Sequence, residues 1–148
     1  MMRERGTYLV PTLATRTGLQ ESKFPPIVQQ KANLALESQD SMVRRALQMG
    51  VKIALGTDAA VYPHGNNALE FMLMTNDGMP PAQALRAGTS VAATLLGLDT
   101  KIGTLEPGKL ADIVAVPGNP IEDIKLTQSV VFVMKQGVVY RNDHSSNH

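Results

Sequence analysis

One carboxylate in this sequence stands where a protein of the right fold would carry out chemistry. Asp58 lies in Gly56-Thr57-Asp58-Ala59, directly after the apolar run of residues 51–55. In parallel α/β proteins the carboxyl ends of strands are where catalytic groups gather. A carboxylate there can bind a divalent metal or take a proton from metal-bound water. The simpler alternative is that Asp58 caps the turn after the strand.

Two nearby residues extend this interpretation without completing a site. His64, on the loop that follows, could reach the same edge as a substrate contact, or it is an ordinary surface histidine. Glu70 follows Asn67 at the spacing of a capping box, so a helix-capping role is favoured over a functional one. Because metal sites need about three or four ligands, Asp58 and His64 alone do not make one.

The elements that must position Asp58 alternate between strand and helix patterns. Residues 6–10 and 51–56 are short runs of β-forming residues next to glycine, which predicts two buried strands. Between them, residues 27–49 have apolar positions spaced by three, four and seven, which predicts one long amphipathic helix ending at Gly50. A strand, a helix and a strand in this order predict a right-handed parallel crossover unit.

Two more helices are expected after this unit. The first begins at Asn67 and runs to about residue 76, with Met72 in the core and Met74 partly covered. Pro80 and Pro81 begin the second helix, which continues to Gly97 and allows a break at residues 88–90.

From residue 102 onward the pattern changes to short β runs separated by Pro and Gly turns. Strands are expected at residues 103–105, 111–116, 130–135 and 138–140, the last two forming a hairpin through Gln136-Gly137. The expected domain organisation is a first unit over residues 1–101, a strand domain over residues 102–141 and a frayed tail over residues 142–148.

Composition excludes several classes of protein. The 148 residues are 43% hydrophobic and 18% charged, which suits at most one modest globular domain. The net charge of +1 comes from scattered residues of both signs, so a nucleic-acid partner is not expected. Without cysteine, any metal must be held by His, Asp or Glu. No apolar run approaches the roughly 18 residues of a membrane span and no signal peptide precedes Pro11, so a cytoplasmic protein is expected.

Two motifs together resemble one family. The first is Gly56-Thr57-Asp58-Ala59 with the loop to His64, and the second is residues 102–114, IGTLEPGKLADIV. They resemble the amidohydrolases, in the branch of imidazolonepropionase and Xaa-Pro dipeptidase (prolidase). The second motif, of the form I-G-[ST]-[LI]-E-x-G-K-x-A-D-[IL], is the specific one, and it follows the first by about 45 residues. The resemblance extends over about residues 1–141.

This resemblance implies the fold class. Members of the family have a (β/α)8 barrel with a small β-sandwich. The chain is therefore expected to be α/β, with the last two strand–helix units of that metal-dependent hydrolase barrel followed by C-terminal strands of the sandwich. By the same resemblance, residues 6–10 match barrel strand seven, residues 51–56 match strand eight, residues 106–108 turn back to the sandwich, and Asp112 is structural.

The resemblance also implies the chemistry. Asp58 matches the strand-eight aspartate, which in the family ligates the metal and handles the proton of the bridging hydroxide. His64 matches a loop histidine near the substrate. The expected metal is a divalent ion, zinc by analogy with the family. The expected substrate of the complete enzyme is a small-molecule amide or a dipeptide, whose C–N bond is cleaved by metal-activated water.

Most metal ligands of the family have no counterpart here. Its H-x-H pair on strand one, its strand-four lysine and its histidines on strands five and six would lie before Met1. We therefore expect the isolated chain to be inactive. It is expected to need the missing N-terminal barrel segment or to self-associate, because strand edges and apolar helix faces would be uncovered. The alternative is a non-catalytic truncated remnant or partner-binding fragment. An independent small binding domain is disfavoured, since there is no Gly-rich phosphate loop.

Overall fold

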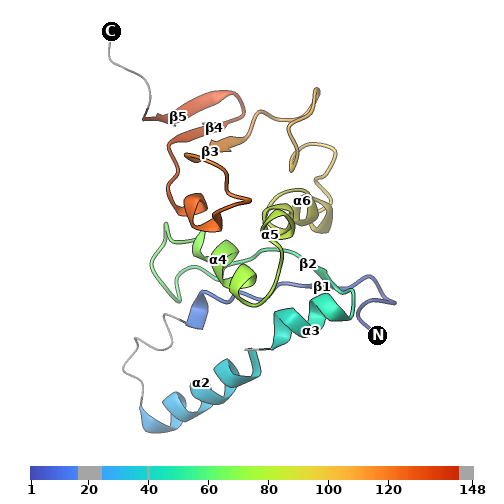
Figure 1. The fold of residues 1–148 in the computed structure, drawn as a ribbon, viewed down its shortest axis with the longest axis vertical. Coiled ribbons are helices and arrows are strands. Elements are labelled where there is room, and N and C mark those ends of the chain that lie inside the picture. The colour runs from blue at the N-terminus through green and yellow to red at the C-terminus, as the bar shows by residue number, and fades with distance from the viewer. Residues whose placement is uncertain (17–24, 40, 144–148) are drawn as a thin grey trace.

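The structure, a computed structural model, describes residues 1–16, 25–39 and 41–143. Its elements are spread along the long axis of the molecule (Figure 1). A lone helix lies at one end, a parallel strand pair with short helices in the middle, and a small antiparallel sheet at the other end. Helices thus combine with two separate small sheets, which is the α/β content expected from the sequence.

The parallel pair consists of β1 (Tyr8–Leu9) and β2 (Lys52–Ile53). Beyond the regular pairing, the amide of Ala54 donates to the carbonyl of Leu9 at 3.0 Å. The predicted parallel arrangement is therefore confirmed, although each strand is shorter than the sequence suggested. In the described part of the chain neither strand pairs with a third strand, so the outer edge of each strand is unpaired.

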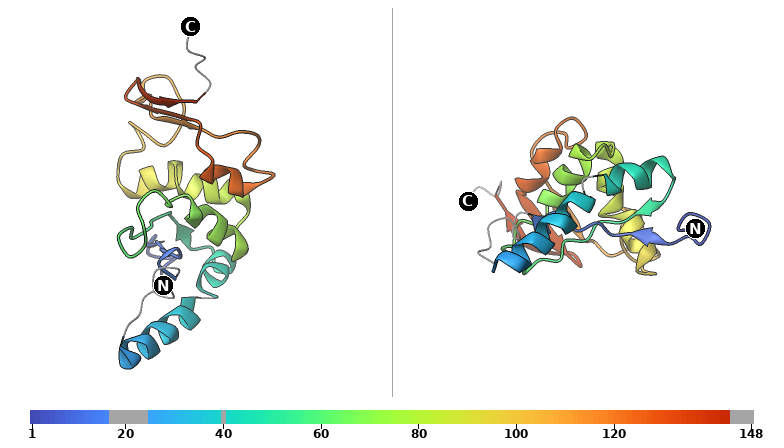
Figure 2. Two further views of the ribbon diagram at one scale, coloured as in Figure 1. Left: turned by 90° about the vertical axis from the view of Figure 1, so that its left-hand side faces the viewer. Right: turned by 90° about the horizontal axis from the view of Figure 1, so that it is seen from below.

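The connection between the two strands is divided, whereas the sequence predicted a single helix. It forms α2 (Pro26–Gln39) and α3 (Met42–Gln48). In α3 the apolar face is buried as predicted, with Val43 at 0% exposure. In α2 it is buried in part: Ala32 is 9% exposed, but Val28 is 42% exposed, because this helix extends away from the rest of the molecule (Figure 2).

Three short helices follow the strand pair: α4 (Leu69–Asn76), α5 (Pro81–Ala87) and α6 (Ser90–Leu95). The break between α5 and α6 is the one allowed by the sequence at residues 88–90. Gly88 belongs there for a packing reason, since a Cβ on it would lie 2.7 Å from ring atoms of Phe71 and 3.3 Å from Cδ1 of Leu55. None of the helices in the described residues is long and apolar enough to cross a lipid bilayer.

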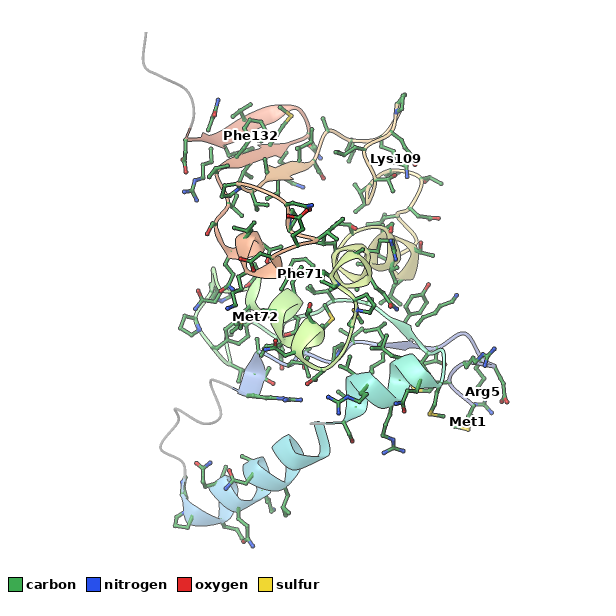
Figure 3. All side chains as sticks on the ribbon, in the orientation of Figure 1. Met1, Arg5, Phe71, Met72, Lys109 and Phe132 are labelled. Atoms are coloured by element: carbon green, nitrogen blue, oxygen red, sulfur yellow. The ribbon has the colours of Figure 1, made fainter. Side chains whose placement is uncertain are left out.

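The core lies between the parallel pair and helices α3, α4 and α5. Its buried members include Leu13, Val43, Ile53, Met74, Met79, Ala84 and Ala87. The prediction for the two methionines of α4 was wrong in order: Met74 is fully buried, whereas Met72 (labelled in Figure 3) is only partly buried. The reason is that α4 turns the face bearing residues 70 and 74 toward the core, one helical turn apart.

The antiparallel sheet has the order β3-β4-β5, with β3 (Ile113–Ala115), β4 (Phe132–Lys135) and β5 (Val138–Asn142). The 3-10 helix η1 (Ile124–Gln128) lies between β3 and β4 in the chain and packs against α4. The strand predicted at residues 103–105 does not form. Residues 144–148 of the predicted tail lie outside the described residues.

The predicted hairpin between β4 and β5 is confirmed. Gln136 and Gly137 have φ values of 50° and 81°, the left-handed pair that a tight two-residue turn requires. Oδ1 of Asp112 accepts a hydrogen bond from the Gln136 amide at 2.8 Å, and the Gly137 amide donates to the Ala111 carbonyl at 3.1 Å. Asp112 therefore anchors the hairpin tip, in agreement with a structural role.

Candidate functional site

Asp58 lies just beyond the carboxyl ends of the two parallel strands. The two chain segments stay close beyond the paired residues. A Cβ on Gly56 would lie 2.4 Å from Cγ1 of Val10 and 3.9 Å from Cγ2 of Thr12. The segments that follow the two strands are therefore in contact, and Asp58 is two residues further along the second one.

Asp58 and Thr12 share an uncommon backbone conformation. Their φ values are 50° and 47°, in the left-handed region that few residues other than glycine adopt. Such conformations cost on the order of 1–3 kcal/mol each and persist where the surroundings hold them, often at active sites. The amide of Val61 donates to the Asp58 carbonyl at 3.3 Å, so the chain turns at the aspartate. The Asp58 side chain itself is exposed.

His64 lies on the same loop, between β2 and α4. Its side chain is exposed, and within the described part of the chain no hydrogen bond joins it to Asp58. Tyr62, between them, is only 4% exposed and holds the middle of the loop to the body of the protein. The loop thus carries both predicted site residues at the surface, on either side of the buried Tyr62, and no hydrogen bond joins them.

Asp58 alone does not fit a metal ion. Among the described residues there is no group of three or more His, Cys, Asp or Glu side chains that could hold one. A protein metal site needs about three or four ligands. These residues therefore offer one carboxylate donor, and a metal at this edge requires ligands from beyond them.

Glu70 has a role that differs from the one predicted. The N-cap of α4 is Ala68, without a side-chain capping bond, and Glu70 is fully buried at 0% exposure. Its Oε1 accepts from the Leu13 amide at 2.7 Å and its Oε2 from the Ala14 amide at 2.8 Å. The capping prediction was wrong because α4 begins at Leu69, which turns Glu70 to the core side of the first turn rather than back to Asn67.

Charged groups surround this buried carboxylate. Burial raises the pKa of Glu70, while the two backbone amides and the Arg16 charge lower it and the Asp77 charge raises it. Arg16 and Asp77 form an ion pair at 3.6 Å with side chains 19% and 15% exposed. Glu70 in the first turn and Asp77 at the C-cap therefore tie both ends of α4 to residues 13–16. The sequence held one signal of this role, the single charge within the apolar run ALEFMLM at residues 68–74. An acidic residue in a buried stretch needs polar partners, because acidic residues are almost never fully buried unless paired.

A hollow of about 480 Å³ lies at the other end of the parallel strands. It is lined by residues near their starts, including Tyr8, Gly50 and Lys52, and by Arg86 and Thr94 from α5 and α6. The Lys52 ammonium lies 5.1 Å from the centre of the Tyr8 ring. Asp58 does not line this hollow, so it is not part of the candidate site.

The sequence is similar to several characterised proteins. Ochratoxinase from Aspergillus niger is 33% identical over 149 residues, covering 95% of this chain and 31% of the relative. Imidazolonepropionase from Acinetobacter baumannii is 36% identical over 119 residues, covering 77% of this chain and 25% of the relative. The chain thus spans about a third or less of the length of these relatives.

Solved structures give the same result. A Xaa-Pro dipeptidase with methionine bound in its active site superposes with a TM-score of 0.89 and 42% identity, covering 95% of this chain and 36% of that one. A prolidase in complex with N-methylphosphonate-L-proline has a TM-score of 0.84 and 28% identity, covering 95% of this chain and 36% of that one. The resemblance to prolidase and imidazolonepropionase expected from the two motifs is confirmed.

These relatives agree with a match at the level of the family. Residues 1–140 match the amidohydrolase family, whose members are generally dependent on a divalent metal. The match includes both sequence motifs, the parallel strand pair and all but the end of the antiparallel sheet. The chain therefore belongs to the amidohydrolase family.

Proposed function

We propose that this chain is the C-terminal segment of an amidohydrolase that cleaves non-peptide or dipeptide C–N bonds with metal-activated water, and that Asp58 is a metal ligand and proton acceptor. The observation that carries the proposal is the position of Asp58, exposed at the carboxyl end of two paired parallel strands and held in a left-handed conformation. Barrel enzymes gather their catalytic groups at that edge.

The barrel assignment is part of the proposal. β1 and β2 would be the last two strands of a (β/α)8 barrel, in residues 1–101, and β3, β4 and β5 would belong to a β-sandwich in residues 102–141. The parallel pairing of two strands joined by helices supports the first part. The separate antiparallel sheet supports the second.

Asp58 would supply one carboxylate donor to a site completed by residues that the described chain does not contain. The metal, which we propose to be zinc, activates water and polarises the carbonyl in such enzymes. The part of Asp58 is to accept a proton and pass it to the leaving nitrogen. His64, exposed on the same loop, would contact the substrate, a dipeptide or small-molecule amide. Because a single donor does not hold the metal, the isolated chain should not turn over substrate.

The test compares the isolated chain with a reconstituted complex. The chain is purified and dialysed, and its zinc content, its size by gel filtration and its hydrolysis of a dipeptide such as Met-Pro are measured. The chain is then co-expressed with the N-terminal two-thirds of the similar Xaa-Pro dipeptidase and measured again. We expect neither bound zinc nor turnover for the chain alone, and both for the complex.

Variants of the complex assign the roles. Asp58→Asn should lower kcat by roughly 100-fold or more, the range for loss of a general acid–base group. Asp99→Asn, an exposed aspartate after α6, is the matched control and should not. His64→Ala should raise KM more than it lowers kcat. An Asp58→Asn complex as active as the wild-type complex would contradict the assignment. A complex that forms without zinc or turnover would favour the non-catalytic remnant.

A further inference from the structure

We propose that Glu70 is a positioning residue for this site: its carboxylate closes the base of the loop that carries Asp58 and His64. This inference rests on the proposed function, because a fixed loop base matters for catalysis only if Asp58 acts at this edge. The role is carried by the geometry around residues 10–14, against which both ends of the loop pack.

The first end of the loop is packed against Val10, two residues before Thr12. Gly56 lacks a side chain, and the methyl group of Val10 occupies the space that a Cβ would need, 2.4 Å away. The methyl group of Thr12 lies 3.9 Å from the same position. The chain leaving β2 is thus packed tightly against the chain leaving β1, two residues before Asp58.

The second end of the loop is held by Glu70. The loop returns to the body of the protein at α4, and the fully buried Glu70 in the first turn binds the amides of Leu13 and Ala14 at 2.7 and 2.8 Å. Both carboxylate oxygens are used, one for each of two consecutive amides. Burying a carboxylate is unfavourable unless it is hydrogen-bonded. Because hydrogen bonds to a charged acceptor are short and strong, the two bonds fix the position of the carboxylate relative to both amides.

The segment between the two attachment points is itself strained. Thr12 has a φ of 47° and lies directly before the two amides that Glu70 binds. Its carbonyl accepts from the Thr15 amide at 3.3 Å and from the Thr15 hydroxyl at 2.8 Å. Glu70 therefore helps to hold the left-handed turn at Thr12, which lies two residues after Val10, the residue that packs against Gly56 at the start of the Asp58 loop.

The test measures amide hydrogen exchange by NMR in the full 148-residue chain. In Glu70→Gln one oxygen is replaced by an NH2 group that cannot accept. We expect the Leu13 and Ala14 amides to exchange at least about 10-fold faster, and the Val61 amide, which donates to the Asp58 carbonyl, at least about threefold faster. Amides in β4 and α6 should change less than twofold. Glu106→Gln, an exposed glutamate paired with Lys109, is the matched control and should change none of these amides.

A rescue variant tests the part played by strain. Glycine adopts positive φ without steric cost, so Thr12→Gly in the Glu70→Gln background should slow exchange at Leu13 and Ala14 by about fivefold. A double variant that exchanges as fast as Glu70→Gln would overturn the link between Glu70 and the Thr12 turn. If Glu70→Gln does not fold, Glu70→Asp, which keeps the charge and shortens the side chain, is measured with the same expectations.

Two other results would overturn the proposal. Uniform acceleration along the whole chain would give Glu70 a general structural role only. Faster exchange at residues 13 and 14 with Val61 unchanged would confine its effect to the loop after β1. The measurement needs neither metal nor turnover, so an inactive reconstituted complex would contradict the hydrolase proposal while leaving this result readable.

Discussion

The buried carboxylate of Glu70 lies among groups that move its pKa in opposite directions. Burial raises the pKa above the ordinary value of 4.5, and it outweighs the two amide donors and the Arg16 charge, which lower it. The folded chain therefore binds this proton more tightly than the unfolded chain does. Glu70, which joins α4 to the segment after β1, therefore also makes the stability of the fold depend on pH.

The sign of that dependence can be predicted. Between pH 4.5 and the raised pKa of Glu70 the folded state binds more protons than the unfolded state, so the stability that Glu70 contributes falls as the pH rises through this window. Urea unfolding of the wild type and of Glu70→Gln, from pH 4.5 to neutrality, measures it. The free energy of unfolding of the wild type minus that of Glu70→Gln should decrease as the pH rises. A difference that is constant or increases would contradict the prediction.

Gly56 is the second residue on which this edge depends. Gly56→Ala should destabilise the fold by about 1–3 kcal/mol, because the added methyl group would lie 2.4 Å from Cγ1 of Val10. Val10→Ala in the same background should restore most of that loss by removing the methyl group it meets. The free energies of unfolding of the two single variants and the double variant form a cycle. Strictly additive losses would show that the two residues do not meet.

At the scale of elements, helix α6 is in close contact with Gly103, the first residue of the segment that the sequence predicted as a strand. Gly103 has a φ of 94°, and a Cβ on it would lie 2.6 Å from Cβ of Ala93 and 3.1 Å from Cα of Ser90. The Ile102 amide donates to the Leu98 carbonyl at 3.0 Å. The first part of the IGTLEPGK motif thus serves to seat the chain closely against α6 before it enters the antiparallel sheet.

Gly103 and Gly108 of that motif allow the cost of backbone strain to be measured separately from the cost of close packing. Gly108 has a φ of 89°, close to that of Gly103, but no atom lies within 4 Å of its added Cβ. Gly108→Ala should therefore cost only the conformational strain, about 1–2 kcal/mol. Gly103→Ala should cost about 1–3 kcal/mol more, because it also meets α6. Urea unfolding compares them, and equal losses would rule out the close packing of Gly103.

At the scale of the whole molecule, the described residues leave much apolar surface uncovered. Ile27 and Leu34 of α2 are 62% and 61% exposed, and Val138 and Tyr140 of β5 are 56% and 71% exposed. The parallel pair has no further strand on either side in the described residues. Exposed apolar faces and open strand edges favour association with other chains.

We therefore expect the isolated chain to self-associate as its concentration rises. Sedimentation velocity should show the mean mass increasing with concentration, with little effect of added salt, since the contacts are apolar. The double variant Ile27→Lys and Leu34→Lys should weaken the association, whereas Lys31→Glu, at an exposed position of the same helix, should not. A monomer at all concentrations would show that these surfaces do not drive association.

Much of this architecture could be predicted because its signals are local. The Gln136-Gly137 turn, the break at Gly88 and the parallel strand–helix–strand unit depend on turn chemistry and on apolar periodicity within a few residues. The family could be predicted because residues 102–114 form a specific motif, and the comparisons with known proteins confirm it. The roles of Asp58 and His64 stay predictions that follow from this membership.

The tertiary structure alone decided what Glu70 does. Its partners, Leu13 and Ala14, precede it by 57 and 56 residues, so the local sequence showed a charge within an apolar run and a capping pattern with Asn67, but not the two amides that Glu70 binds. The same holds for Met74, which is buried because α4 turns that face to the core. It also holds for the strand predicted at residues 103–105, whose first residue, Gly103, packs against α6 instead. A short segment carries its turn and period signals within itself, but burial and hydrogen-bond partners depend on which distant segments pack against it.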